Sequence, residues 1–268
     1  RIVMRILITS DLHFDIWAAD NKSPLDLAQP GTFDDLDALI IAGDISNSPK
    51  TGWKPALREL ARHVPADRIH VFPGNHDYYG HVLDGDDRLR DIAAAEGVNF
   101  AQQRVIRVGD ARFICCTLWT DFLFDGSLSA GMRMAESNMS DYRRIRLAAR
   151  DYSPIRALDV AAVHHRHKTW IIEKLEEHWS GPTYVVTHHC PHPLLLGYRQ
   201  QYAAAYASDL RPIMSRYQPD GWYFGHTHCR ITARVGKTRV VNISVGYPFE
   251  EQFGSSFNGA IVLSPKAL

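Results

Sequence analysis

Five short apolar runs divide the chain, and each of them ends abruptly in polar residues. The runs are rich in Val, Ile, Tyr and Phe and do not alternate with polar residues, which is typical of strands buried on both faces. We therefore expect a strand in each of these segments: 5–13, 38–44, 69–77, 183–189 and 221–228. Two further stretches, 103–119 and 230–244, each predict two strands joined by a two-residue hairpin turn.

Helical patterns separate these strands. The spacing of apolar residues predicts helices over three segments: 54–64, 87–97 with Gly97 as a stop, and 208–218 with Ser208 as a cap. These helices connect consecutive buried strands, as expected for strands that run parallel within a sheet.

Residues 121–180 carry no strand pattern, and their second half predicts a long amphipathic helix that begins at Ser153 and Pro154. The buried strands and the hairpins together predict an α/β fold, in which two mixed β-sheets pack face to face with helices outside them. We expect one domain over residues 1–268, with 121–180 as a helical cap insertion.

Composition narrows the classes of function. The chain has 268 residues, of which 45% are hydrophobic, and this is enough to build a full core. Thirty basic and thirty acidic residues give a net charge of zero, which argues against binding to long nucleic acid or to an anionic membrane. The four cysteines form no disulfide framework and no run of 18 apolar residues occurs, so we expect a cytoplasmic protein.

The polar residues that follow the buried strands include seven possible metal ligands: Asp11, His13, Asp44, Asn75, His188, His226 and His228. The carboxyl ends of parallel strands meet at one edge of a sheet, so these side chains should converge. Two carboxylates, one amide and four imidazoles are too many for one tetrahedral ion, but they suit two ions that share a carboxylate. This donor set favours Mn, Fe, Zn, Ni or Co, and two such ions can hold a hydroxide between them and clamp a phosphoryl group.

The ordered motifs "DLH", "GD", "GNHD", "THH" and "GHTH" resemble those of the calcineurin-like metallophosphoesterase superfamily, and the match spans residues 5–228. The resemblance implies a four-layer αββα sandwich with a dinuclear metal centre and a bridging hydroxide. By motif position, the first ion would be held by Asp11, His13, Asp44 and His228, and the second by Asp44, Asn75, His188 and His226. The resemblance also implies that His76 is the general acid.

Three points around these motifs stay open. His189 competes with His188 as a ligand, and only motif position favours His188. Asp77 either fixes the turn or orients a neighbouring imidazole. Protein serine/threonine phosphatases of this superfamily carry an aspartate that supports the catalytic histidine, and this chain has Asn47 there and Ser48 in place of a phosphate-binding arginine. How His76 is supported is therefore not settled by the sequence.

The remaining candidates have simpler interpretations. Solitary histidines are usually structural, which applies to His63, His70, His81, His178 and His192, and to His164, His165 and His167 on the long helix. Cys190 and Cys229 either pack as small buried thiols or lie near the ions. Arginines crowd the insertion, and either they form a solvated helix face or they bind phosphate through their forked donors. On the second interpretation, we expect Tyr142 and Arg143 to contact the substrate.

The sequence thus predicts a metal-dependent phosphoric ester hydrolase, a phosphatase or phosphodiesterase that acts on phosphomonoesters or phosphodiesters of small molecules. A cyclic-nucleotide phosphodiesterase or a nuclease of the same superfamily is an alternative. A catalytically inactive scaffold would be expected to lack some ligands, whereas all seven are present here. The oligomeric state is left open.

Overall fold

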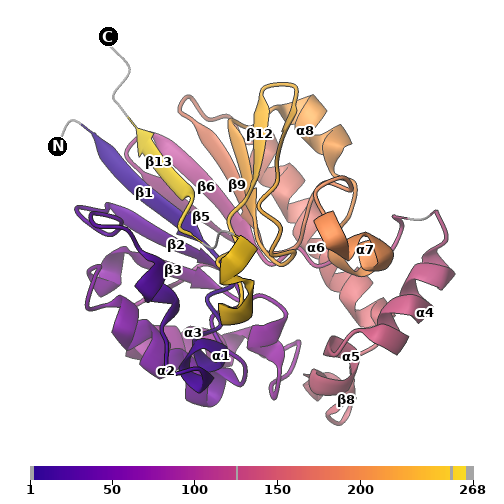
Figure 1. Ribbon diagram of the computed structural model, residues 1–268. Helices are drawn as coiled ribbons and strands as arrows, with labels where there is room; N and C mark the ends of the chain where they lie inside the picture. Colours follow the sequence, from indigo (N-terminus) through magenta and orange to yellow (C-terminus); the bar gives the residue numbers. More distant parts are fainter. Residues whose placement is uncertain (1–2, 125, 254–255, 264–268) are drawn as a thin grey trace.

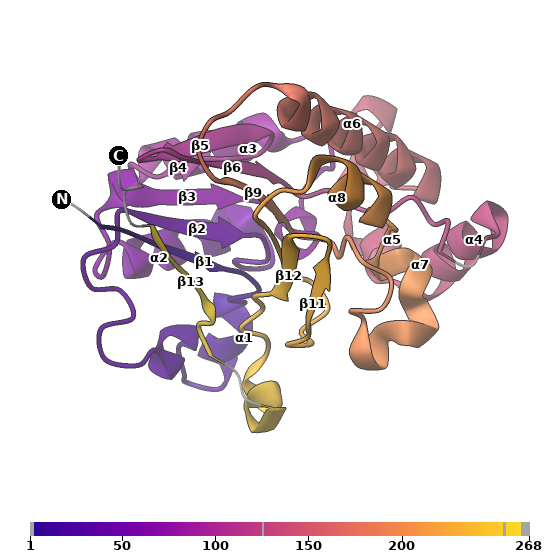
Figure 2. The same ribbon diagram turned by 90° about the horizontal axis from the view of Figure 1, so that it is seen from above.

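A computed structural model describes residues 3–124, 126–253 and 256–263. Two mixed β-sheets lie face to face, and helices cover their outer faces (Figures 1 and 2). The predicted α/β arrangement of two sheets between helices is therefore confirmed.

The first sheet brings four parallel strands together with one antiparallel edge strand. Its spatial order is β13 (Gly259–Leu263), β1 (Met4–Thr9), β2 (Ala38–Ala42), β3 (Ile69–Phe72) and β4 (Asn99–Phe100). The sequence predicts the three central strands. It misses β4, which is only two residues long, and β13, whose alternating burial marks a half-exposed edge.

The second sheet contains both predicted hairpins. Its order is β11 (Thr232–Val235), β12 (Thr238–Asn242), β10 (Gly221–Phe224), β9 (Thr183–Thr187), β6 (Ala111–Cys116) and β5 (Arg104–Val108). The hairpin turns contain Gly109 with φ 60° and Gly236 with φ 59°, a backbone region that glycine adopts without steric cost. Strands β6, β9, β10 and β12 run parallel, so the polar segments that follow β9 and β10 leave the sheet at the same edge.

The core between the sheets follows from the two-residue period of the strands. Ile6 and Ile8 of β1 face the second sheet and pack in one cluster with Phe113 and Val186. Leu7 points the other way, into a cluster that contains the apolar faces of the helices. Both faces of the central strands are thus buried, which explains their unbroken apolar sequence.

The helices are α1 (Phe14–Ala19), α2 (Pro49–Leu60), α3 (Asp86–Ala95), α4 (Leu128–Asn138), α5 (Asp141–Arg144), α6 (Ala157–Glu176), α7 (Ala203–Tyr206) and α8 (Arg211–Tyr217). Short 3-10 helices cover Pro24–Leu27, Ala66–Arg68, His76–Tyr78, Ala148–Arg150, Gly197–Tyr202 and Pro248–Phe253. Helices α1, α2 and α3 lie on the first sheet, and α6 and α8 lie on the second (Figure 1).

Three predicted helix starts are wrong. The helix expected from residue 54 begins five residues earlier, at Pro49 of α2. Ser153 and Pro154 do not begin the long helix, because they pair with β7 (Arg146–Leu147) as the short strand β8. Helix α6 begins at Ala157 instead. Ser208 does not cap α8, which begins at Arg211, because its hydroxyl accepts a hydrogen bond from the backbone of Asp121.

The segment 121–180 contains helices α4, α5 and α6 and also the short β7–β8 pair, which the sequence did not predict. Its two halves differ. Helix α6 contacts β6 and α8 and so belongs to the layer that covers the second sheet. Helices α4 and α5 project from the sheets, and α4 contacts both α5 and α7 (Figure 1). Among the described residues, no helix combines the length and apolarity that crossing a bilayer requires.

Candidate metal centre

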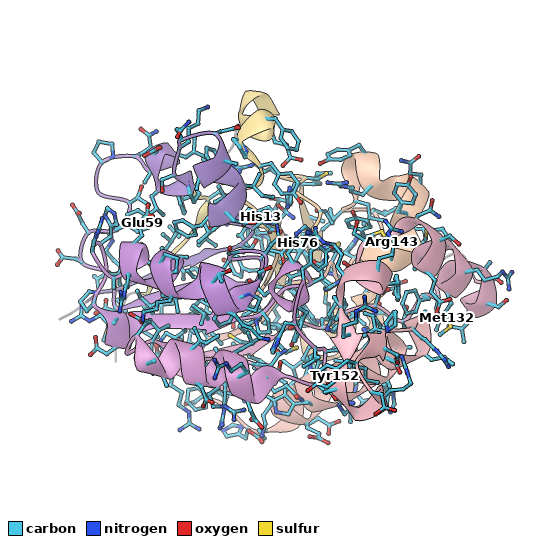
Figure 3. All side chains as sticks on the ribbon, turned by 90° about the horizontal axis from the view of Figure 1, so that it is seen from below. His13, Glu59, His76, Met132, Arg143 and Tyr152 are labelled. Atoms are coloured by element: carbon cyan, nitrogen blue, oxygen red, sulfur yellow. The ribbon has the colours of Figure 1, made fainter. Side chains whose placement is uncertain are left out.

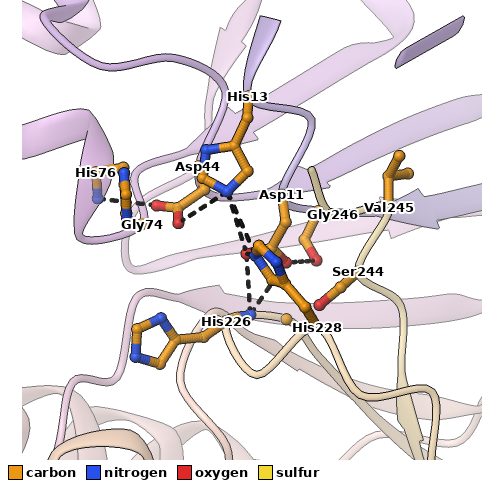
Figure 4. A network of polar contacts seen from close by, with 12 residues as sticks. Asp11, His13, Asp44, Gly74, His76, His226, His228, Ser244, Val245 and Gly246 are labelled. Carbon is orange, nitrogen blue, oxygen red and sulfur yellow. Dashed lines mark hydrogen bonds and ion pairs between the residues drawn. The ribbon is translucent and has the colours of Figure 1, made fainter. Parts of the chain in front are cut away.

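The seven predicted ligands converge where β1, β2, β3, β9 and β10 end, and Figure 4 shows five of them. The backbone there is strained. Five non-glycine residues have left-handed φ angles between 41° and 66°: Asp11, His13, Asp44, His226 and His228. Such conformations cost free energy and are kept where a side chain must be aimed, as at functional sites.

Two motif glycines let the ends of β2 and β3 approach each other. A Cβ atom on Gly43 would lie 2.5 Å from the backbone nitrogen of Gly74, which is far inside van der Waals contact. A Cβ on Gly74 would overlap the carboxylate of Asp44. The glycine in "GD" and the one in "GNHD" are therefore required by this packing.

The first donor group consists of Asp11, His13 and His228, whose ligand atoms lie within 4.8 Å of one another. The Nε2 atoms of His13 and His228 are 3.4 Å apart, and the Nε2 of His228 lies 3.1 Å from Oδ1 of Asp11. The carboxylate of Asp11 also accepts hydrogen bonds from the backbone of His226 and the hydroxyl of Ser10.

The second donor group consists of Asp44, His188 and His226, again within 4.8 Å. The Nε2 atom of His188 lies 3.5 Å from Oδ1 of Asp44 and 3.1 Å from Oδ1 of Asn75. His226 packs flat on Tyr206 with ring centroids 4.4 Å apart. Its Nε2 is buried and has no hydrogen-bond partner among the described residues.

Asp44 lies between the two donor groups. Its Oδ2 is 3.6 Å from Nε2 of His13, whereas its Oδ1 is 3.5 Å from Nε2 of His188. One carboxylate thus presents a different oxygen to each group. Asp44 is therefore within reach of both donor groups.

The charges of this centre fit a cation. Burial lowers the pKa of His13 to about 3, and it also holds the pKa of His226 well below its usual range, so both rings are neutral and can donate lone pairs. Burial disfavours a charged His188, but Asp44, Asp11 and the carbonyl of Ala42 together outweigh burial and raise the pKa of His188 to about 9. In the same way, Asp11 raises the pKa of His228 to about 9. These two rings bind a cation by releasing a proton.

Residues outside the donor groups hold the ligands in orientation. Nδ1 of His188 lies 2.8 Å from the carbonyl oxygen of Ala42, and Nδ1 of His228 lies 2.7 Å from Glu250, which leaves each Nε2 facing the centre. The amide nitrogen of Asn75 donates to Asp141 at 2.9 Å, so its oxygen points toward His188. The sequence did not reveal Glu250 or Asp141.

Asp77 fixes the turn, which answers the question that the sequence left open. Burial raises the pKa of Asp77 to about 7. However, five N–H groups surround its two oxygens, and a protonated carboxyl group would direct its own O–H toward these donors. The ionised carboxylate, which only accepts hydrogen bonds, therefore fits the site. The donors are the backbone amides of Asp44, Ile45, Ser46 and Gly74 and the indole of Trp53. Asp77 therefore ties the loop after β2 to the loop after β3.

Replacing Asp77 with alanine should lower the free energy of unfolding by about 3 kcal/mol or more, because several buried N–H groups lose their acceptor. Urea unfolding, followed in the presence and in the absence of a chelator, measures this loss apart from any loss of metal. Asp77→Asn keeps the shape and one acceptor oxygen, so it should lose less. Equal stability of Asp77→Ala and the unaltered protein would contradict the structural role.

His76 belongs to neither of the two donor groups described above, but a ring nitrogen of His76 lies within 4.8 Å of ligand atoms of His13 and Asp44. Its ring is 4.9 Å from that of His13 and 4.4 Å from that of Tyr79, measured between centroids. Its Nδ1 lies 3.0 Å from Oδ1 of Asn47, and the amide nitrogen of Asn47 donates to Asp15 at 2.8 Å. Asn47 thus occupies the supporting position that is an aspartate in protein serine/threonine phosphatases.

A cavity of about 300 Å³ opens over the centre and is lined by Asp44, Asn75, His76, His226 and His228 among others. Two arginines also line it, Arg144 and Arg199. The guanidinium of Arg144 lies 4.7 Å from the centroid of Tyr79. Nε of Arg199 is buried without a hydrogen-bond partner among the residues described.

The two predicted substrate contacts do not lie in this cavity. The Tyr142 side chain is buried in the apolar core. Arg143 is exposed and lines a neighbouring cavity. The next residue, Arg144, is the one that reaches the centre.

His189, His164, His167 and the four cysteines lie outside the two donor groups. His189 is buried against His226 with centroids 4.2 Å apart, but it belongs to neither donor group. His164 and His167 attach α6 to the backbone of Leu118. All four cysteines are buried free thiols.

The chain is a metallophosphoesterase. Its two sheets bring carboxylate, amide and imidazole groups together at the strand ends, as a metal-dependent enzyme of this class needs. The family model of calcineurin-like phosphoesterases matches residues 4–230, so the chain belongs to that family. The family resemblance seen in the sequence is thereby confirmed. Among curated proteins, none matches the chain in sequence.

Two solved structures are similar to this chain to different degrees. The phosphopantetheinyl hydrolase of Mycobacterium tuberculosis superposes with a TM-score of 0.72 at 20% identity, covering 99% of this chain and 97% of that one. A putative 5'-nucleotidase from Staphylococcus aureus gives a TM-score of 0.49 at 16% identity, covering 98% of this chain and 51% of that one. At 20% identity, the likeness to the phosphopantetheinyl hydrolase concerns the fold alone.

Proposed function

We propose that this phosphoesterase hydrolyses phosphomonoesters or phosphodiesters of small molecules at a centre of two metal ions. The observation that carries the proposal is the position of Asp44, whose two oxygens face two separate donor groups. Asp11, His13, Asp44 and His228 would hold one ion, and Asp44, Asn75, His188 and His226 would hold the other. The nitrogen and oxygen donors favour Mn, Fe, Zn, Ni or Co.

When bound, two ions would supply an activated water and balance negative charge on the phosphoryl oxygens. The residues of the chain would do the rest. Arg144 and Arg199 line the same cavity and would bind phosphoryl oxygens through their forked N–H donors. His76 would protonate the leaving oxygen, and Asn47, 3.0 Å from its Nδ1, would keep the ring turned toward the substrate.

The volume of the cavity and the net charge of the chain support a small substrate. A cavity of about 300 Å³ is at the lower end of the usual range for small-molecule sites. The formal net charge of zero does not favour long nucleic acid. The free, buried thiols agree with a reducing compartment, and we place the protein in the cytoplasm on that basis.

A phosphopantetheinyl ester is a second candidate substrate. It is suggested by the superposition on a phosphopantetheinyl hydrolase, which covers nearly the whole of both chains. Cyclic nucleotides and single-stranded DNA are retained as alternatives for the same reaction. An inactive scaffold is disfavoured, because all seven ligands and His76 are gathered in one place.

A substrate screen tests the proposal. Protein reconstituted with Mn²⁺, Zn²⁺ or Fe²⁺ is assayed on p-nitrophenyl phosphate, bis-p-nitrophenyl phosphate, cyclic nucleotides, a phosphopantetheinyl ester and single-stranded DNA. We expect turnover of one of the first two substrates and loss of that turnover in chelator. A metal-loaded protein that is inactive on every substrate would contradict the proposal and favour the interpretation as an inactive scaffold.

A further inference from the structure

A second cavity, of about 650 Å³, adjoins the one over the metal centre. Five cationic side chains line it: Lys50, Arg88, Arg143, Arg144 and Arg146. They come from the start of α2, from α3 and from the segment around α5. Arg144 lines both cavities, so the two recesses share a wall. Figure 3 shows this face with Arg143 and Tyr152 labelled.

None of these cations is paired with a carboxylate of the described residues, and the one carboxylate shown to lie nearby, that of Asp84, offsets at most one of the five positive charges. Among the described residues, none of the five forms an ion pair, and no carboxylate lines the cavity. The carboxylate of Asp84 lies near Lys50 and Arg88, because the charges of all three act on the pKa of His81. However, its two oxygens accept hydrogen bonds from the backbone amides of Ala148 and Ala149, both at 2.9 Å.

Like charges gathered in a recess repel one another, and a multivalent anion is the ligand that relieves the repulsion. Arginine forks match the oxygens of a phosphate group in particular. A concave cavity of about 650 Å³ is the size of a small-molecule site. The shape therefore favours a small anionic group over the flat surface of an acidic protein.

We propose that this cavity binds a second phosphate group of the substrate, distinct from the phosphate that is hydrolysed. The preferred substrates are then small molecules that carry two phosphate groups. One phosphate lies at the metal centre and the other lies among Arg143, Arg146 and their cationic neighbours, with Arg144 between them. This inference rests on the proposed hydrolase function and specifies the substrate class.

The test compares bisphosphates with matched monophosphates. Ethanediol, butanediol and hexanediol bisphosphates, each beside its own monophosphate, vary the distance between the two groups. For at least one length we expect kcat/KM to exceed that of the monophosphate by about 10-fold or more. In the double variant Arg143→Gln/Arg146→Gln this ratio should fall to about one, mainly through a rise in KM for the bisphosphate.

The double variant Arg62→Gln/Arg133→Gln removes the same charge from exposed positions outside both cavities and should keep the ratio of the unaltered protein. A ratio of one at every length in the unaltered protein overturns the inference and leaves the hydrolase standing. A preference for the bisphosphate that persists in Arg143→Gln/Arg146→Gln also overturns the inference. The same holds for a preference that the control variant loses to the same extent. No turnover of any monophosphate or of p-nitrophenyl phosphate instead contradicts the proposed function itself, and the inference with it.

Discussion

Asp44→Asn should empty both donor groups of metal at once and reduce kcat/KM by about 10³-fold or more. The reason is that Asp44 presents one oxygen toward His13 and the other toward His188, so one substitution weakens two sites. Elemental analysis of the purified variant, together with its rate on p-nitrophenyl phosphate, measures both effects.

Two matched substitutions make this result specific. Asn75→Ala removes a donor near His188 only, so it should lower occupancy at one ion and leave the other bound. Asp87→Asn changes the same functional group at an exposed carboxylate and should change nothing. Two ions per chain in Asp44→Asn, under conditions where the unaltered protein holds two, would contradict the bridging role.

The framework of the site is predictable because it follows from strand periodicity. A buried parallel strand must end at the sheet edge, and the polar residues after it meet those of its neighbours. This argument brings the seven predicted ligands to one edge without knowledge of any long-range contact. Family motifs then favour His188 over its neighbour His189, and of the two only His188 has a ligand atom within a donor group of the structure.

The residues that hold the ligands could not be predicted in this way. Glu250 lies 22 positions from His228, and Asp141 lies 66 positions from Asn75. The chain contains 30 acidic residues, and no local pattern marks the two that meet a ligand. Their partners are set by how the loops fold over the centre, which is a property of tertiary packing.

The sequence could not tell which side chain of α5 lines the cavity over the metal centre, for a related reason. Successive residues on a helix point about 100° apart, so a one-residue error selects a different face. In α5, Tyr142 is buried, Arg143 faces outward and Arg144 reaches the metal centre. Composition predicts that arginines of this segment bind phosphate, but only the packing of α5 shows that Arg144 is the one that lines the cavity over the metal centre.

His76→Ala should leave the metal content unchanged and slow hydrolysis of an alkyl phosphate by about 10²- to 10⁴-fold, the usual contribution of a general acid. An alkoxide leaves poorly unless it is protonated, whereas p-nitrophenolate leaves readily as the anion. The loss on p-nitrophenyl phosphate should therefore be much smaller. Rates on the two esters, measured with elemental analysis of the same samples, separate loss of the proton donor from loss of metal.

Asn47 provides the matched test of how His76 is held. Asn47 contacts Nδ1 of His76 and is itself hydrogen-bonded to Asp15. Asn47→Ala should therefore release the ring and slow hydrolysis by part of the His76→Ala effect. As for His76→Ala, the loss should be larger on the alkyl phosphate than on p-nitrophenyl phosphate. Asn47→Asp retains an acceptor oxygen at that position and should keep most of the activity. If His76→Ala slows both esters equally, the ring serves to bind substrate or metal, and the proton must come from another group.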